Sequence, residues 1–268
     1  MEIAVSGRKT YAYTGGRPFD AGLPAIVFIH GAEHDHSVWA LQSRYFAHHG
    51  HSALALDLPG HGRSEGPPAG RVEDLAQWLV HFLDAVRVPR AALVGHSMGS
   101  LIALETAARN PQRIDRIALI GSAVPMPVAE VLLDAARNDE PRAMAMINAW
   151  SYSARARLGG NTVPGMWMVG TNRRLMQRQA KGVLHTDLAA CNAYVQGPES
   201  AARVACPALL VMGSRDQMTP PRASKPLANA LPRAQTVAIS GSGHALMAEQ
   251  PDAVLDALRS FLMGRMPA

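Results

Sequence analysis

The stretch Ala91-Ala-Leu-Val-Gly-His-Ser-Met-Gly-Ser100 organises the rest of the sequence. Its apolar run ends at Gly95, and from Met98 onward the apolar residues recur at helical spacing, which predicts a strand, a sharp turn at Ser97 and a helix. Such a turn strains the serine backbone and presses the positions two before and two after it together, where Gly95 and Gly99 have no side chains to clash. The N–H groups of Met98 and Gly99 would then lie unpaired at a helix N-terminus, which favours an anionic oxygen.

Length and composition limit the class of protein. With 268 residues, 48% apolar and 18% charged, the chain can form one large domain or a domain with a sizeable insertion. No stretch approaches the roughly 20 apolar residues of a membrane-spanning helix, and the first residues lack the layout of a secretion signal. We therefore expect a cytoplasmic protein with no membrane partner. Cys191 and Cys206 are too few for a disulfide framework or a zinc site, so we expect both to be buried.

The positive charge does not indicate a nucleic-acid partner. The formal net charge is +5, but the basic residues are scattered and nearly all are arginine, with lysine only at Lys9, Lys181 and Lys225. They form no basic stripe and accompany no helix-turn-helix pattern. We expect a solvated, arginine-rich surface and no nucleic-acid binding.

The order of predicted elements indicates an α/β protein. A short hairpin over 3–14 precedes apolar runs at 25–29, 53–56, 114–120, 206–212 and 235–239, which are typical of strands covered on both faces of a parallel sheet. Helical patterns lie between most of these strands. Between 123 and 204, however, several helix-like segments follow one another with no strand, which indicates an insertion.

Several motifs resemble those of bacterial serine carboxylesterases of the α/β-hydrolase superfamily. Gly95-His96-Ser97-Met98-Gly99 matches the G-x-S-x-G nucleophile elbow, Asp57-Leu-Pro-Gly-His-Gly-Arg-Ser64 resembles the D-x-P-G-x-G-x-S turn, and His30-Gly31 ends a strand as in that family. The resemblance implies an α/β-hydrolase fold: a mostly parallel central sheet flanked by helices, with a helical cap inserted between core strands. We expect residues 1–123 and 205–268 to form the core and 124–204 the cap. Ser100 departs from the glycine that often follows the elbow.

Ser97, Asp216 and His244 follow predicted strands in the order Ser, Asp, His that this fold uses. A serine hydroxyl needs a base to take its proton; His244 can be that base, and Asp216 can orient its ring. The resemblance assigns the oxyanion hole to the backbone N–H groups of Ala32 and Met98. His96 is expected to point away from the serine and to pack.

No cofactor or metal is expected. The loop Glu33-His34-Asp35-His36 contains potential ligands, but no distant third ligand can be named for them, so we interpret it as a polar loop near the pocket mouth. In the DLPGHGRS turn, Asp57 is expected to bind backbone amides and not substrate.

The 124–204 block is rich in methionine, which predicts either helix packing or an adaptable acyl pocket. We name Met126, Trp150 and Met168 as candidate substrate-binding residues, together with Trp39, which resembles a tryptophan that often follows His-Gly in the family.

A serine nucleophile points to chemistry at a carbonyl and excludes the aspartate-dependent dehalogenases and epoxide hydrolases. We therefore expect a carboxylesterase that acts on small-molecule esters with short to medium acyl groups, as a monomer or homodimer. Four alternatives stay open: a carbon–carbon bond hydrolase, a lactonase, a perhydrolase, and a ligand-sensing protein of the same fold with little turnover.

Overall fold

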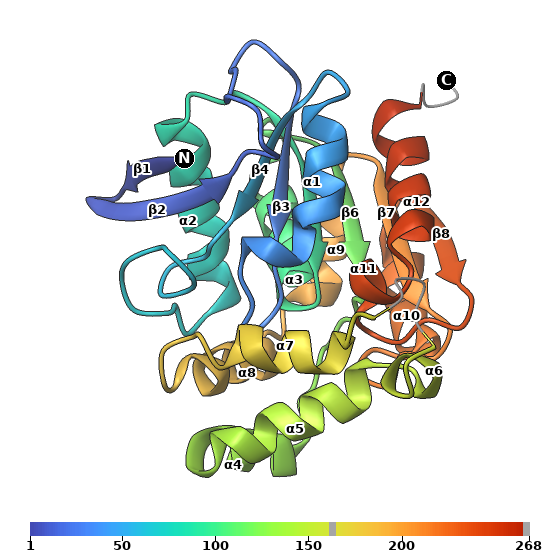
Figure 1. Cartoon of the computed structure of the whole chain (residues 1–268). Helices are drawn as coiled ribbons and strands as arrows, with labels where there is room; N and C mark the ends of the chain where they lie inside the picture. The colour runs from blue at the N-terminus through green and yellow to red at the C-terminus, as the bar shows by residue number, and fades with distance from the viewer. Residues whose placement is uncertain (161–164, 265–268) are drawn as a thin grey trace.

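The computed structural model describes residues 1–160 and 165–264. Within them an eight-stranded sheet has the order β1-β2-β4-β3-β5-β6-β7-β8 (Figure 1). Strands β1 and β2 form a hairpin, β2 pairs antiparallel with β4, and all the other pairs are parallel. The strands are β1 (Glu2–Val5), β2 (Arg8–Tyr13), β3 (Ala25–Ile29), β4 (Ser52–Leu56), β5 (Ala91–His96), β6 (Ile114–Ile120), β7 (Ala208–Gly213) and β8 (Ala234–Ile239).

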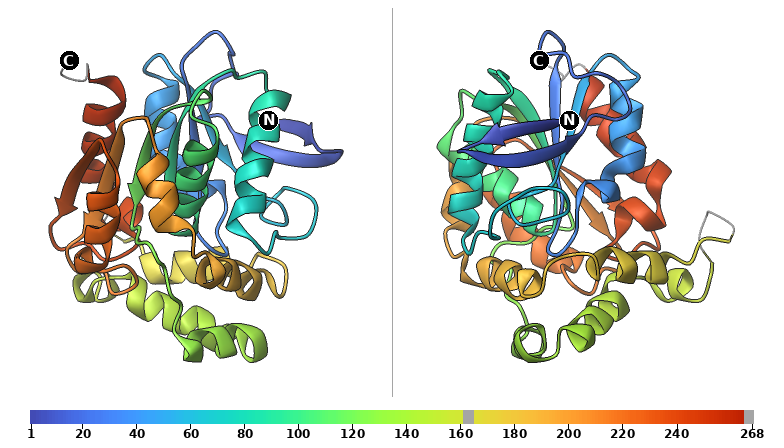
Figure 2. Two further views of the ribbon diagram at one scale, coloured as in Figure 1. Left: turned by 180° about the vertical axis from the view of Figure 1, so that it is seen from behind. Right: turned by 60° about the vertical axis from the view of Figure 1, so that its left-hand side comes forward.

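Helices cover both faces of the sheet, and this explains why the central strands are apolar throughout. On β3, Val27 and Ile29 face one core with helices α2 (Val72–Ala85) and α3 (Met98–Arg109), whereas Ile26 and Phe28 face a second core. The second core also holds residues of the 3-10 helix η1 (His36–Trp39), α1 (Ala40–Ala47), α11 (Leu246–Glu249) and α12 (Pro251–Met263). In Figure 2 the left view shows from behind the helix layer that contains α2 and α3, and the right view shows the sheet nearly edge-on.

The segment between β6 and β7 is helical in its described part. It contains α4 (Glu130–Asn138), α5 (Glu140–Ser151), α6 (Ala154–Arg157), α7 (Met168–Met176), α8 (Val183–Ala193) and α9 (Gly197–Arg203). Helices α4 to α8 lie across the end of the sheet at which the parallel strands terminate (Figure 1), whereas α9 packs on α3. Residues 161–164 of this segment lie outside the described residues. Helix α10 (Pro221–Ala230) links β7 to β8.

No helix in the described ranges has the length and apolar character needed to cross a lipid bilayer.

Candidate active site

Ser97 occupies a sharp turn between β5 and α3. Its φ of 51° and ψ of −119° are strained for a residue with a side chain, and its N–H donates to Ile120 O at 2.9 Å. Gly95 is pressed against Gly99 as expected, because a Cβ on Gly95 would lie 2.1 Å from Gly99 O. The closest obstruction at Gly99 is instead the end of β3, since a Cβ there would lie 2.3 Å from Ile29 O. The turn therefore tolerates only glycine at these two positions and presents Ser97 to a cavity at the end of the sheet.

Asp216 and His244 come from the loops after β7 and β8 and form a buried pair. His244 Nδ1 donates to Asp216 Oδ2 at 2.7 Å, so the Nε2 of neutral His244 is an acceptor. Asp216 also accepts from the N–H groups of Met218 and Thr219 and from the Thr219 hydroxyl, each at 2.8 Å. Burial alone would raise the pKa of Asp216, but the His244 charge and these hydrogen bonds outweigh it and lower the pKa to about 2.

Ser97 and His244 line the same cavity, so the structure brings together the three residues expected to form the triad. No hydrogen bond joins Ser97 Oγ to His244 Nε2 among the described residues. Catalytic hydrogen bonds of unliganded enzymes are often long and shorten when substrate binds. The arrangement is therefore compatible with proton transfer from serine to histidine.

The two backbone N–H groups expected to form the oxyanion hole lie beside Ser97. Met98 is the first residue of α3, and a Cβ on Gly31, which precedes Ala32, would lie 3.2 Å from Ser97 Cβ. Within 1–160 and 165–264 neither the Ala32 nor the Met98 N–H has a hydrogen-bond partner. Both are therefore available as donors.

His30 fixes the peptide that carries the Ala32 N–H. Its Nε2 accepts the Leu58 N–H at 3.1 Å, so the proton of the neutral ring must be on Nδ1, which donates to Gly31 O at 2.8 Å. Burial and the nearby His61 keep the pKa of His30 well below its usual value, which favours the neutral ring.

His96 does more than pack, contrary to the expectation from sequence. It lines the cavity, its Nε2 donates to His244 O at 2.9 Å, and the two ring centroids are 4.8 Å apart. It therefore supports the backbone and ring of His244. Sequence reasoning missed it because its partner lies 148 residues away.

The cavity has a volume of about 260 Å³ and mostly apolar walls. Of the four candidate substrate-binding residues, only Met168 lines it. Trp39 is buried against Phe28, Met126 belongs to the core around α3, and Trp150 of α5 packs against the cluster formed by α4, α5, α7 and α8. These three side chains contribute to core packing, which corrects their expected place in the pocket.

The cavity walls carry no Asp, Glu, Lys or Arg among the described residues. The apolar lining side chains are Ala32, Val38, Ala40, Leu41, Ile147, Met166, Met168, Leu175, Leu188, Met218, Ala245, Met247, Ala248 and Pro251.

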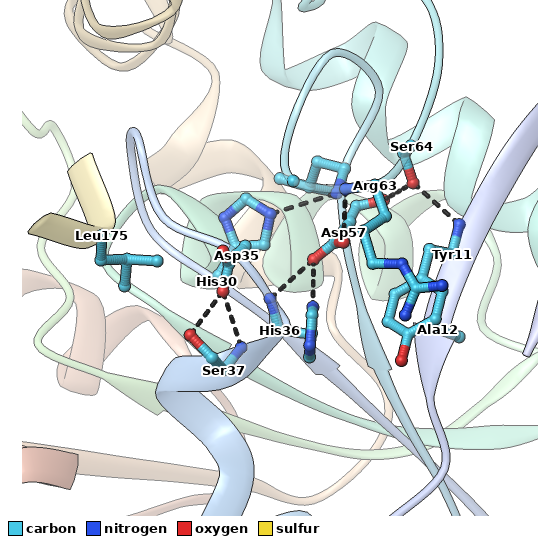
Figure 3. Close-up of polar contacts among 12 residues, drawn as sticks. Tyr11, Ala12, His30, Asp35, His36, Ser37, Asp57, Arg63, Ser64 and Leu175 are labelled. Atoms are coloured by element: carbon cyan, nitrogen blue, oxygen red, sulfur yellow. Dashed lines mark hydrogen bonds and ion pairs between the residues drawn. The ribbon is translucent and has the colours of Figure 1, made fainter. Parts of the chain in front are cut away.

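The ligand atoms of Asp35, His36 and Asp57 lie within 4.8 Å of one another, but they serve the loops around them (Figure 3). Asp57 Oδ1 accepts from the N–H and the Nδ1 of His36, and its Oδ2 accepts the Arg63 N–H at 2.9 Å. Asp35 accepts from Ser37, which follows it in η1. The expectation that Asp57 binds backbone amides is confirmed.

Comparisons with known proteins agree with this architecture. A family profile described as the α/β hydrolase fold matches residues 24–251. Esterase YbfF of Escherichia coli is 29% identical over 218 residues, which cover 79% of this chain and 83% of that protein. The (E)-2-((N-methylformamido)methylene)succinate hydrolase of Acinetobacter baylyi is 23% identical over 243 residues, covering 88% and 89%. The enol-lactonase structure from Burkholderia xenovorans superposes with a TM-score of 0.86 at 25% identity, covering 98% of this chain and all of the other.

Proposed function

Because the chain belongs to the α/β-hydrolase fold family, we propose that it is a serine esterase acting through an acyl-enzyme on Ser97. The observation that carries this proposal is that His244, paired with Asp216, lines the same cavity as the strained serine of the elbow, Ser97. The similarity to a relative named as an esterase, YbfF of Escherichia coli, supports this proposal.

In the proposed mechanism Ser97 Oγ attacks the ester carbonyl while His244 Nε2 takes its proton. Asp216 holds the proton on Nδ1 and stabilises the imidazolium that forms. The Ala32 and Met98 N–H groups receive the tetrahedral oxyanion, and such donors are each worth ~2.7–4 kcal/mol of barrier. His244 then protonates the leaving alcohol and afterwards activates the water that hydrolyses the acyl-enzyme.

The cavity walls favour an uncharged substrate. A buried carboxylate or ammonium group needs a partner of opposite charge, and the described walls offer none. An apolar acyl group of short to medium length suits a cavity of about 260 Å³. This argues against a dicarboxylate such as the succinate named for the Acinetobacter relative.

A lactone is the second candidate substrate, because the structural neighbour is named an enol-lactonase. A lactone is a cyclic ester, so the same residues would open it by the same steps. An uncharged lactone fits the walls better than one that carries a carboxylate.

We also propose that residues 124–204 act as the cap of this site. Ile147 of α5, Met168 and Leu175 of α7, and Leu188 of α8 all line the cavity that Ser97 faces. Replacement of these side chains should therefore change acyl selectivity and leave the bond-breaking step intact.

The test is turnover of p-nitrophenyl esters of graded acyl length, with an uncharged lactone beside them, by the parent protein and by Ser97→Ala. We expect the alanine variant to lose at least about 10³-fold in kcat. A fluorophosphonate should label the parent and the matched variant Ser100→Ala but not Ser97→Ala. Full ester turnover by Ser97→Ala would overturn the proposal.

A further inference from the structure

The loop that carries the Ala32 N–H contains a strained residue. In this loop, residues 31–35, Glu33 is buried and has a φ of +54°, a left-handed conformation that is unfavourable for a residue with a side chain. Such a conformation persists only where surrounding contacts impose it. One of these contacts comes from a distant helix.

Asp187 of α8 supplies that contact. Its Oδ2 accepts the Glu33 N–H at 2.8 Å, and Asp187 is 1% exposed. On the other side of the same peptide, His34 Nδ1 donates a hydrogen bond to Ala32 O at 2.7 Å. The peptide that links Ala32 to Glu33 is thus held at both ends, which restrains Ala32, a residue that lines the same cavity as Ser97.

His61 balances the charge of Asp187. Its Nε2 donates to the same Oδ2 at 2.8 Å, and its Nδ1 faces Pro59 O at 3.0 Å. Because both nitrogens face acceptors, both carry protons and the ring is a cation. Burial alone would lower the pKa of His61, but the Asp187 charge and these hydrogen bonds raise it above its usual value.

This buried pair is not explained by stability. A buried ion pair commonly contributes little net stability because both charges lose their hydration. Asp187 Oδ1 also has no hydrogen-bond partner among the described residues, which adds to its cost. A buried carboxylate with this cost suggests that its role is to hold the Ala32–Glu33 peptide in place.

We propose that Asp187 is a positioning residue for the oxyanion hole: from cap helix α8 it holds the Glu33 peptide and so aims the Ala32 N–H at the oxyanion formed on Ser97. The inference rests on the proposed function. The geometry of loop 31–35 then depends on the cap, because the carboxylate that accepts the Glu33 N–H belongs to α8.

The test compares Asp187→Ala with two matched variants. Asp187→Asn keeps an oxygen that can accept the Glu33 N–H. Arg178→Ala removes another contact from the cap to the same loop, the 2.8 Å ion pair of Arg178 with Asp35, which does not touch the Ala32–Glu33 peptide. Thermal unfolding of each variant checks that it folds, and Asp187→Leu, which is branched at the same carbon and has as many heavy atoms, replaces Asp187→Ala if that variant does not.

We expect Asp187→Ala to lower kcat about 100-fold with KM changed less than about threefold, because an oxyanion contact acts in the transition state. Inhibition by an arylboronic acid, whose adduct with serine mimics the oxyanion, should weaken in parallel. Asp187→Asn should stay within about tenfold of the parent in kcat and Arg178→Ala within about twofold.

Equal losses in Asp187→Ala and Arg178→Ala would overturn the inference, since the cap would then act only as a whole. An increase in KM with kcat unchanged would also overturn it. These outcomes are separate from failure of the proposed function, which would show as retained turnover in Ser97→Ala.

Discussion

Gly95→Ala is the sharpest perturbation of the elbow. The added methyl group would lie 2.1 Å from Gly99 O, 2.4 Å from Gly99 C and 2.7 Å from Ser100 N. Favourable contacts of a carbon atom lie at about 3.5–4.0 Å, so β5 and α3 would have to separate by more than about 1 Å. All three obstructing atoms belong to the backbone, and no side-chain rotation relieves the clash.

The expected cost follows from this geometry. Overpacking of a tight core costs about 1–3 kcal/mol, and a clash with backbone alone belongs at the upper end, near 3 kcal/mol. For a chain of this length that corresponds to a fall of about 10 °C in Tm. The same displacement moves Ser97 relative to His244, and a misplacement of about 1 Å can lower kcat about 100-fold.

Thermal unfolding and p-nitrophenyl ester turnover of the purified variant measure both effects. Gly70→Ala is the matched control, because a Cβ there meets no heavy atom of the described residues within 4 Å and the backbone is not left-handed. A Gly95→Ala protein that melts within about 2 °C of the parent and keeps its kcat within about twofold would refute the steric account of the elbow.

Three further outcomes are expected. The pKa of Asp216 is lowered from 3.8 to about 2, so its ionised carboxylate adds about 2 kcal/mol to the free energy of unfolding above pH ~4. This contribution is lost as the pH falls to ~2, and the free energy of unfolding of Asp216→Asn, measured over the same acid range, should lack the loss. Tyr194→Phe removes a 2.6 Å hydrogen bond to the buried Glu105 and should cost about 1.5–3 kcal/mol in denaturant unfolding. Leu175→Trp narrows the cavity and should lower kcat/KM for longer acyl esters about tenfold or more relative to acetate.

The predictions that held depend on short-range sterics and on strand order. Gly95 is required by contacts within a few residues, although Gly99 is required by the end of β3, and the apolar runs at 25–29 and 114–120 form the strands that the sequence pattern predicts. The carboxyl ends of parallel strands share one edge of the sheet, so residues at those ends could be placed near one another before the structure was known.

The cap side chains were predicted less well. Methionine and tryptophan are equally suited to helix packing and to a pocket wall, and the sequence does not say which face of each helix turns toward the cavity. Met168 of α7 lines the cavity, whereas Trp150 of α5 packs elsewhere, because the crossing of one helix over another decides the facing side. Met126 lies in the loop before α4 and packs into the core.

By itself, the sequence determined the sheet, the elbow and which strand ends carry Ser97, Asp216 and His244, since local backbone sterics and apolar periodicity act over a few residues. Only the tertiary structure decided that His96 supports His244 and that Asp187 holds the loop beside Ala32. These pairs are 148 and 154 residues apart and obey no spacing rule. The sheet brings the loop after β8 beside the end of β5, the packing of α8 on the core brings Asp187 to the loop of Glu33, and burial then requires that these polar groups pair.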